Sequence, residues 1–445
     1  MIHPEVITRK RVFQIAWPII LSNISIPLLG LVDTAVIGNL GQASLIGSIA
    51  LGALMFSFLY WGFGFLRMGT TGLVAQAFGA GQFEEVKATV YRAMLLALAI
   101  GFVLLILNVP LLASALYFLD GSALVEGGAA EYFTIRIWSA PATLLNLALL
   151  GLFLGLQDTR AVLKLQFLLN GLNIVLDLVF VLGFEWGVAG VASATLIAEY
   201  VTVVVALYMF RSRLGKLDPR AVNTLRISRS ALLNSSALRH MLVVNGDLMI
   251  RTISLIFAFA WFTNQGAKSG DVLLAANSIL MQLVSFAAFF MDGFALAAES
   301  LIGAAIGAKN RERLISGIYR TSELAIITSV LLSIVFALGG EHIINFLTNV
   351  ESVRQAGLEY LPWVIAAPII SVFCFQLDGI FIGATATRAM RNAMLISLAL
   401  YLGTFQVLGA SFGNHGLWAS LILYYVYRAV TLWLRMPVVY SKIRN

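Results

Sequence analysis

Twelve long apolar segments follow one another along the chain, separated by short polar or charged stretches. About 20 consecutive apolar residues cross the hydrocarbon core of a bilayer as a helix, and these segments are long enough. The pattern therefore predicts an all-α polytopic membrane protein with twelve transmembrane helices. They are expected over residues 13–39, 46–78, 86–113, 131–156, 161–183, 187–211, 240–264, 272–306, 312–339, 356–384, 389–410 and 416–440.

The composition excludes a soluble fold. Of the 445 residues, 60% are apolar and 11% are charged, whereas soluble domains carry about 25% charged residues. The net charge of +7 does not indicate nucleic-acid binding, because Lys and Arg are concentrated in alternate loops. By the positive-inside rule, this distribution predicts a multi-pass protein of the cytoplasmic (inner) membrane with both termini in the cytoplasm.

The longest basic loop, residues 211–239, separates two halves of the chain that repeat one another. AQAFGAGQFEEVKATVYR, which begins at residue 75, aligns with GAAIGAKNRERLISGIYR, which begins at residue 303. GLFLGLQDTR, from residue 151, aligns with GIFIGATATR, from residue 379. The offset between the repeats is the same in both alignments, since 303 − 75 = 379 − 151 = 228. Each half holds six predicted helices. Because six is an even number, both halves enter the membrane from the same side. The sequence predicts an N-lobe (1–210), a cytoplasmic basic linker (211–239) and a C-lobe (240–445), related by a pseudo-two-fold axis along the membrane normal.

The first predicted helix contains an acid, Asp33, among apolar residues. A charge near the bilayer centre costs about 2.5–3.5 kcal/mol on insertion scales, so this carboxyl is expected to be protonated or paired inside the protein. It is a candidate switch. Pro27 cannot donate to the carbonyl of Asn23, which predicts a bend in the helix just before the acid.

Three further helices of the N-terminal half carry stripes of polar residues at helical spacing. The stripes are Ser139, Thr143 and Asn146; Asn170, Asn173 and Asp177; and Thr195, Glu199 and Thr202. In the predicted topology, Asp33, Asp177 and Thr195 lie at one level in the outer half of the membrane. A functional role is favoured for the two acids, because a charged side chain inside the membrane is costly in free energy. For Asn146, Asn170 and Thr202, a functional role and simple interhelical hydrogen bonding fit equally well.

The C-terminal half has a different set of charged residues, expected in the inner half of the membrane. Asp247 and Arg251 stand at i and i+4, where they can pair on one face of their helix, and for these two the preferred interpretation is an ion-pair network that locks the inner end of the bundle. Two interpretations stay open for the rest: an ion-pair network that locks the inner end of the bundle, or a second cation site. The residues concerned are Asp292, Glu299 and Asp378 of this half, together with Arg67 from the second predicted helix of the N-terminal half.

Several catalytic and cofactor motifs are absent. The chain has no GxxxxGK[ST] phosphate loop, no HExxH and no GxSxG, and it has one cysteine, Cys374. Its four histidines are scattered near the ends of predicted helices or near the N-terminus. The sequence thus predicts a protein that is not an enzyme, with no metal site and no cofactor.

The chain resembles the multidrug and toxic compound extrusion (MATE) family, most clearly its DinF-like branch. The segments that carry the resemblance span both halves: LLGLVDTAVIGNLG, NQGAKSGDVLLAANSILMQ, FMDGFALAAESLIGAAIGA and QLDGIFIGATATRAMRNAML. The resemblance implies a V-shaped pair of six-helix lobes, a monomer in the lipid bilayer, and export of small amphipathic or cationic drugs driven by an inward cation gradient. It implies cation coupling by Asp33, Asn173, Asp177 and Thr195.

The function predicted from sequence is a proton-coupled multidrug antiporter that works by alternating access. Protonation of Asp33 and Asp177 and bending of the first helix at Pro27 would expel substrate from an N-lobe cavity near Asn146, Asn170 and Glu199. One alternative is sodium coupling through C-lobe acids, although Asp378 fits the family pattern only loosely. Another is a flippase for lipid-linked precursors, which predicts a lumen rich in Arg and Lys, whereas the N-lobe stripes are acidic and neutral.

Overall fold

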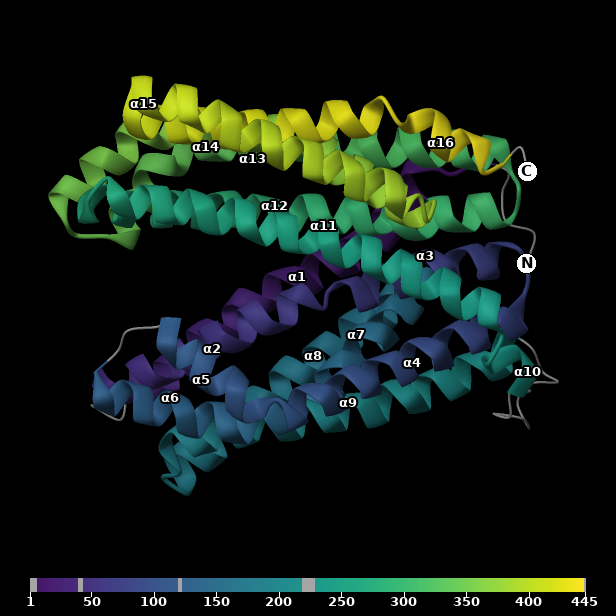
Figure 1. Ribbon diagram of the computed structural model, residues 1–445, viewed down its shortest axis with the longest axis horizontal. Helices are drawn as coiled ribbons and strands as arrows, with labels where there is room; N and C mark the ends of the chain where they lie inside the picture. Colours follow the sequence, from purple (N-terminus) through teal and green to yellow (C-terminus); the bar gives the residue numbers. More distant parts are fainter. Residues whose placement is uncertain (1–5, 39–42, 119–121, 218–228, 444–445) are drawn as a thin grey trace. The chain divides into compact units, whose positions relative to one another are not determined.

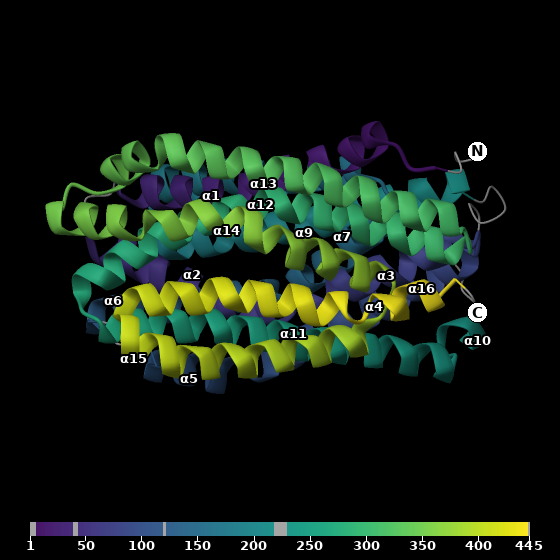
Figure 2. The same ribbon diagram turned by 90° about the horizontal axis from the view of Figure 1, so that it is seen from above.

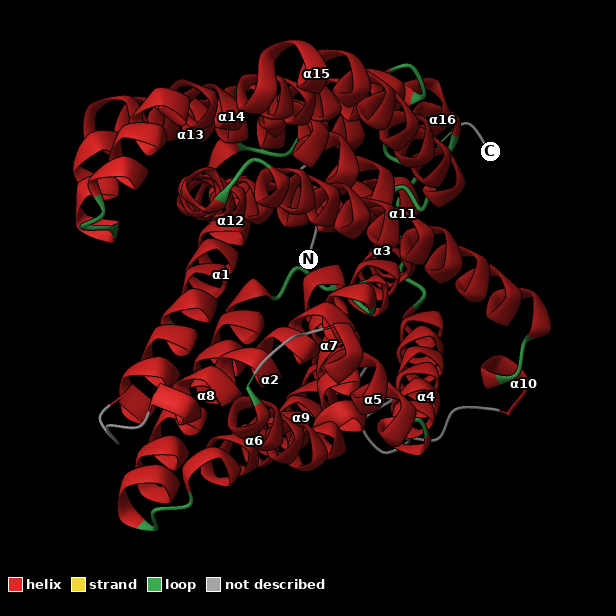
Figure 3. Ribbon diagram, turned by 60° about the vertical axis from the view of Figure 1, so that its left-hand side comes forward, coloured by secondary structure: helices red, strands yellow, loops and turns green. Residues whose placement is uncertain are grey.

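The computed structural model describes residues 6–38, 43–118, 122–217 and 229–443, with side chains omitted at 26–38, 43–44, 118, 216–217 and 229. All regular structure in these ranges is helical (Figures 1 and 3). The elements up to the predicted linker are α1 (Arg9–Gly38), α2 (Ala43–Gly62), α3 (Phe65–Gly79), α4 (Phe83–Ile106), α5 (Asn108–Phe118), α6 (Ala123–Arg136), η1 (Ile137–Ser139), α7 (Ala140–Gly155), α8 (Thr159–Asp177), η2 (Leu178–Gly183) and α9 (Gly187–Leu217). The predicted linker (211–239) contains the end of α9, α10 (Arg229–Leu232) and the start of α11 (Ser235–Lys268), and the elements that follow are α12 (Asp271–Gly307), α13 (Arg311–Leu347), α14 (Glu351–Gly383), α15 (Thr387–Trp433) and α16 (Met436–Ser441).

These elements group into the twelve predicted spans, and the protein is an all-helical polytopic membrane protein. Ten helices of the described residues are long and apolar enough to cross a membrane. Several spans are broken where the sequence disfavours a continuous helix. Pro110 lies in the first turn of α5 and Pro141 in the first turn of α7, where proline is tolerated because the amide would be unpaired anyway. Within α15, Gly413 takes φ 55° and ψ −128°, which separates the last two predicted spans.

By their contacts, the helices form two compact units. One is Leu21–Met241, and the other is Met1–Ile20 together with Leu242–Asn445. The sequence-based lobes assign the segment before Leu21 to the N-terminal half, whereas its described part packs on the C-terminal helices. The Ile7 amide donates to Ser316 Oγ at 3.0 Å, and Arg9 forms an ion pair with Glu323 of α13. In the C-terminal unit, α11 to α15 lie side by side, with α16 near the chain end (Figures 1 and 2).

The internal repeat is also present in the backbone conformation. Non-helical residues with positive φ follow or interrupt the helices at matching places in both halves, as they commonly do after a helix end. They form three pairs at the offset found in the sequence: Gly81 (70°) with Lys309 (51°), Gln157 (58°) with Thr385 (48°), and Glu185 (57°) with Gly413 (55°). The two halves therefore end or interrupt their helices at equivalent positions.

Two close helix crossings repeat in the same way. In each, two glycines one turn apart lie against main-chain oxygens of the neighbouring helix, so that no side chain fits between the backbones. Gly151 and Gly155 of α7 face the carbonyls of Arg67 and Thr71 of α3, and Gly379 and Gly383 of α14 face the carbonyls of Ala295 and Glu299 of α12. Every member of the second crossing follows its counterpart by the offset of the repeat. Small residues that allow this approach are a common basis of helix packing in membranes.

Replacing Gly379 by alanine is expected to destabilise the protein by about 1–3 kcal/mol, because the new Cβ overlaps a backbone atom that cannot move aside cheaply. The matched control is Gly403→Ala in α15, where an added Cβ would enter open space. There, alanine should stabilise the helix by up to about 1 kcal/mol. Thermal unfolding of both purified variants in detergent checks the opposite signs. Equal shifts of both variants would show that the α12–α14 crossing tolerates a side chain.

Candidate functional site

Three of the predicted coupling residues meet between α8 and α9 of the N-terminal unit. Asn173 and Asp177 are one turn apart on α8, and Thr195 projects from α9. With the Asn173 amide nitrogen turned toward Asp177, it lies 3.1 Å from the carboxylate Oδ2, while the amide oxygen lies 3.0 Å from Thr195 Oγ1 and 3.1 Å from the Thr195 backbone nitrogen. Asp177 is 0% exposed. The amide thus links a buried carboxylate on one helix to a hydroxyl on the next.

Local sequence determines how α8 presents these residues. The helix begins at an N-cap, Asp158, whose side chain accepts from the Ala161 amide at 3.3 Å, a common way to satisfy a first-turn donor. It ends at Asp177, after which the chain continues as the π-helical segment η2. Such π-helical turns occur frequently at functional sites. The carboxylate therefore lies at a change of helix geometry.

A second contact connects α8 to α1. The Asn170 side-chain nitrogen donates to Ser25 Oγ at 2.8 Å, and the Asn170 oxygen accepts from Gln166 at 3.1 Å. Asn170 is thereby part of an interhelical bridge, one of the two roles left open for it. Asp33 and Pro27 lie in the part of α1 whose side chains are outside the described residues, so their predicted roles stay predictions.

The third polar stripe forms another bridge. Asn146 of α7 donates from Nδ2 to the Glu199 carboxylate Oε2 at 2.6 Å and to the Glu199 backbone oxygen at 3.1 Å. The Thr202 hydroxyl donates within its own helix to the Ala198 oxygen at 2.8 Å. Both Asn146 and Glu199 are buried. This pair holds α7 against α9, as interhelical polar contacts do in membranes.

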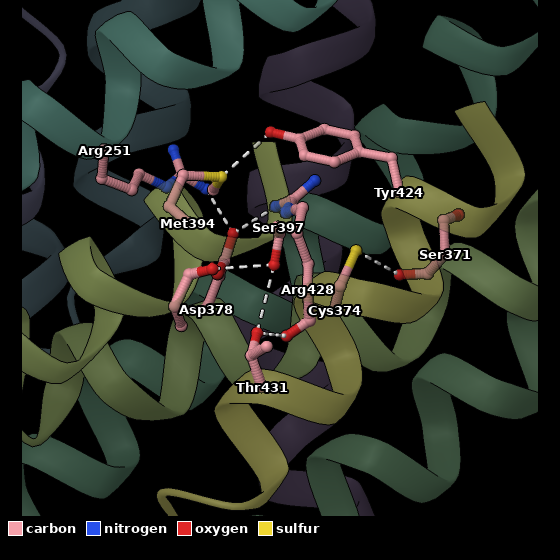
Figure 4. A network of polar contacts seen from close by, with 10 residues as sticks. Arg251, Ser371, Cys374, Asp378, Met394, Ser397, Tyr424, Arg428 and Thr431 are labelled. Atoms are coloured by element: carbon pink, nitrogen blue, oxygen red, sulfur yellow. Dashed lines mark hydrogen bonds and ion pairs between the residues drawn. The ribbon is translucent and has the colours of Figure 1, made fainter. Parts of the chain in front are cut away.

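In the C-terminal unit, one carboxylate is held by two guanidinium groups (Figure 4). Asp378 of α14 accepts at Oδ2 from Arg428 Nη2 of α15 at 2.6 Å and, through the same oxygen, from Arg251 Nη2 of α11. The acid is 5% exposed and Arg428 is 2% exposed. Neighbouring hydrogen bonds of the Tyr424 hydroxyl to Met394 Sδ (3.0 Å) and of Ser397 with Thr431 (3.2 Å) surround the cluster.

Asp247 and Arg251 both form ion pairs, but with residues of other helices and not with each other. Although both residues lie on α11, Asp247 accepts from Arg391 Nη1 at 2.7 Å and from the Thr387 hydroxyl at 3.0 Å. Arg251 instead binds Asp378. The reason is that α14 and α15 bring their own charged residues to the face of α11 that carries both side chains. Pairing between helices gives each of these acids an arginine, which a pair within α11 would not.

The structure does not bring the other predicted residues, Glu299, Asp292 and Arg67, into the ion-pair cluster around Asp378. Glu299 of α12 is buried, and its backbone carbonyl lies against Gly383. Asp292 and Arg67 are half-buried. The principal residue that sequence reasoning missed is Arg428. Its signal was available, because an arginine inside the apolar stretch LILYYVYRAVTLW is as costly as the acids that were selected.

Comparison with known proteins agrees with this architecture. The family model MatE matches residues 18–179 and 248–404. The DNA damage-inducible protein F of Escherichia coli K12 is 40% identical over 423 residues, which cover 95% of this chain and 91% of that protein. A probable multidrug resistance protein NorM of Thermotoga maritima is 26% identical, covering 87% of this chain and 80% of that protein.

Solved structures share the fold. A MOP superfamily transporter from Pyrococcus furiosus superposes with a TM-score of 0.85 at 20% identity, covering 98% of this chain and 97% of that one. An outward-facing MATE family multidrug resistance transporter gives a TM-score of 0.85 at 19% identity with the same coverage. Family model, curated relative and fold agree over nearly the whole chain. The chain belongs to the multidrug and toxic compound extrusion (MATE) family of membrane transporters.

Proposed function

We propose that this MATE transporter is a proton-coupled antiporter that exports small amphipathic, often cationic compounds. It acts as a monomer of two lobes in the cytoplasmic membrane, with both termini in the cytoplasm. The coupling residues are Asp33, Asn173, Asp177 and Thr195. The observation that carries the proposal is the buried Asp177 carboxylate, whose hydrogen-bond partner Asn173 also contacts the neighbouring helix.

The Ser25–Asn170 hydrogen bond supports a place for Asp33 beside this group. In the predicted topology, α1 and α8 are both outward-going helices and therefore run in the same direction. At 1.5 Å per residue, position 33 lies about 12 Å beyond Ser25 along α1, and Asp177 lies about 10 Å beyond Asn170 along α8. The two acids then stand at nearly the same level, as expected for a pair that shares or exchanges a proton.

The hydrogen bonds give protonation a mechanical consequence. An ionised carboxylate only accepts, so it takes the Asn173 amide N–H, whereas a protonated carboxyl can donate. Protonation of Asp177 from the outside would let the amide turn, which changes its contact with Thr195 and so the contact of α8 with α9. A bend of α1 at Pro27 would then reduce the cavity near Asn146, Asn170 and Glu199 and release the compound outward, before the lobes rock back.

The arrangement in the C-terminal unit argues against sodium coupling through Asp378. Two arginines already neutralise this carboxylate, and adding a third positive charge to a buried site is electrostatically unfavourable. The same contacts bear on the flippase alternative. A flippase lumen would require Lys or Arg side chains free to bind phosphate, but Arg251 and Arg428 are buried and bound to Asp378. The stripes of the N-terminal unit contain no Lys or Arg.

The test uses the purified protein in liposomes that contain a pH-sensitive dye. Under an imposed proton gradient, addition of ethidium should trigger proton movement in the wild type and none in Asp33→Asn. A parallel series replaces the proton gradient by a sodium gradient. A response to sodium alone that Asp33→Asn leaves intact would move coupling to the C-lobe acids and refute the proposal, and ethidium flux that ignores both gradients would indicate a passive pore.

A further inference from the structure

An apolar groove lies on the C-terminal unit, and its lining contains none of the residues of the buried ion pairs. Its volume is about 610 Å³, and it is lined by α13, α14, the end of α15 and α16. The lining includes Ile318, Ser322, Phe373, Gln376, Trp433 and Tyr440. The volume is within the range of pockets that hold small organic molecules. None of the described coupling residues belongs to this lining.

One polar side chain in this groove has no partner among the described residues. Gln376 is 3% exposed, and neither its amide nitrogen nor its amide oxygen makes a hydrogen bond within the described part of the chain. A buried polar group without a partner is costly, and native proteins rarely leave one without a reason. The amide offers both a donor and an acceptor to whatever occupies the groove. An occupant that is mostly apolar but carries a hydrogen-bonding group fits both features.

We infer that this groove binds one phospholipid with an anionic headgroup from the cytoplasmic leaflet. The acyl chains lie along the apolar lining, and the glycerol-ester region hydrogen-bonds to Gln376. From Gln376 to the end of α14 at Gly383 the helix rises by about 10 Å. In the predicted topology this end is cytoplasmic. The amide therefore lies just below the membrane surface, at the depth of the ester groups.

The charges near the groove favour an anionic headgroup over a cationic drug. Arg435 is exposed between two lining residues, Leu434 and Met436, and Lys442 is exposed shortly after Tyr440. Basic residues at the cytoplasmic surface attract anionic lipids by about 1 kcal/mol each. Trp433 and Tyr440 are exposed, as aromatic residues at the membrane–water interface are. The basic and the aromatic residues both come from the segment 433–442, which lines one side of the groove.

Native mass spectrometry of the full chain in neutral detergent tests the inference without any transport measurement. Phosphatidylglycerol and phosphatidylcholine are titrated separately, and one tightly bound phosphatidylglycerol per chain is expected. Gln376→Leu should weaken its binding about tenfold through the lost hydrogen bonds. Gln355→Leu, an exposed position on the same helix, should leave binding unchanged. Arg435→Gln combined with Lys442→Gln should abolish the preference over phosphatidylcholine.

A second measurement covers the case in which Gln376→Leu fails to fold. Phosphatidylglycerol with a photoreactive acyl chain is crosslinked to the wild type, and the labelled peptides are mapped. Labels concentrated on α13, α14 and α16 support the site. Labels spread evenly over the membrane surface, or equal binding of both lipids to all variants, would refute it. Displacement of the bound lipid by ethidium at low concentration would reassign the groove to a small cationic molecule and also overturn the inference.

Discussion

Asp177→Asn is expected to reduce substrate-triggered proton movement to the level of empty liposomes. Asparagine matches the carboxylate in shape and can still accept a hydrogen bond from the Asn173 amide, but it cannot gain or lose a proton. The variant should fold with at least the stability of the wild type, because a buried neutral amide costs less than a buried charge. Loss of coupling in a stable protein would therefore identify proton exchange, and not packing, as the role of this residue.

The assay is the dye-loaded liposome measurement with ethidium, accompanied by thermal unfolding of the same preparation. Asp271→Asn is the matched control, since it makes the same chemical change at an exposed position in the first turn of α12. It should retain full exchange. If Asp177→Asn also exchanged protons at the wild-type rate, the α8–α9 cluster would be a structural contact only, and coupling would have to reside elsewhere in the chain.

Much of the fold was predictable because a bilayer imposes strict requirements on sequence. Every span must be apolar and about 20 residues long, so hydropathy alone located the helices. The internal repeat was visible in the glycines and in the Tyr-Arg pair at positions 91–92 and 319–320. What hydropathy could not give was the packing of the segment before Leu21 with the C-terminal helices, because that depends on specific contacts such as Ile7 with Ser316.

The candidate site was predictable where its members share a helix. Asn173 and Asp177 follow from helical spacing, and the depth estimate placed Thr195 at the same level. Partners across helices were harder to predict. Spacing suggested that Asp247 pairs with Arg251, yet both bind residues of other helices. The i, i+4 spacing rule describes pairs within one helix, so it cannot predict which charged residues a neighbouring helix brings to the same place.

Asp378→Ala is expected to destabilise the C-terminal unit by about 3–5 kcal/mol, the usual cost of removing one partner from a buried ion pair. The reason is that Arg251 and Arg428 lose the only carboxylate they are seen to contact among the described residues. Chemical or thermal unfolding in detergent measures the change. If Asp378 were a sodium ligand and not a structural anion, the variant would lose a sodium-dependent stabilisation instead, and unfolding without sodium would be unaffected.

Removing the arginines together with the acid separates these explanations. The triple variant Asp378→Ala, Arg251→Leu and Arg428→Met should recover much of the stability lost in Asp378→Ala, since apolar groups of similar volume often replace a buried ionic cluster at little cost. Arg428→Met alone should cost less than Asp378→Ala, because Arg251 still balances the carboxylate. If the triple variant were less stable than Asp378→Ala, the arginines would have a role beyond neutralising this acid. The presence of two arginines beside one carboxylate would then no longer argue against sodium coupling at this site.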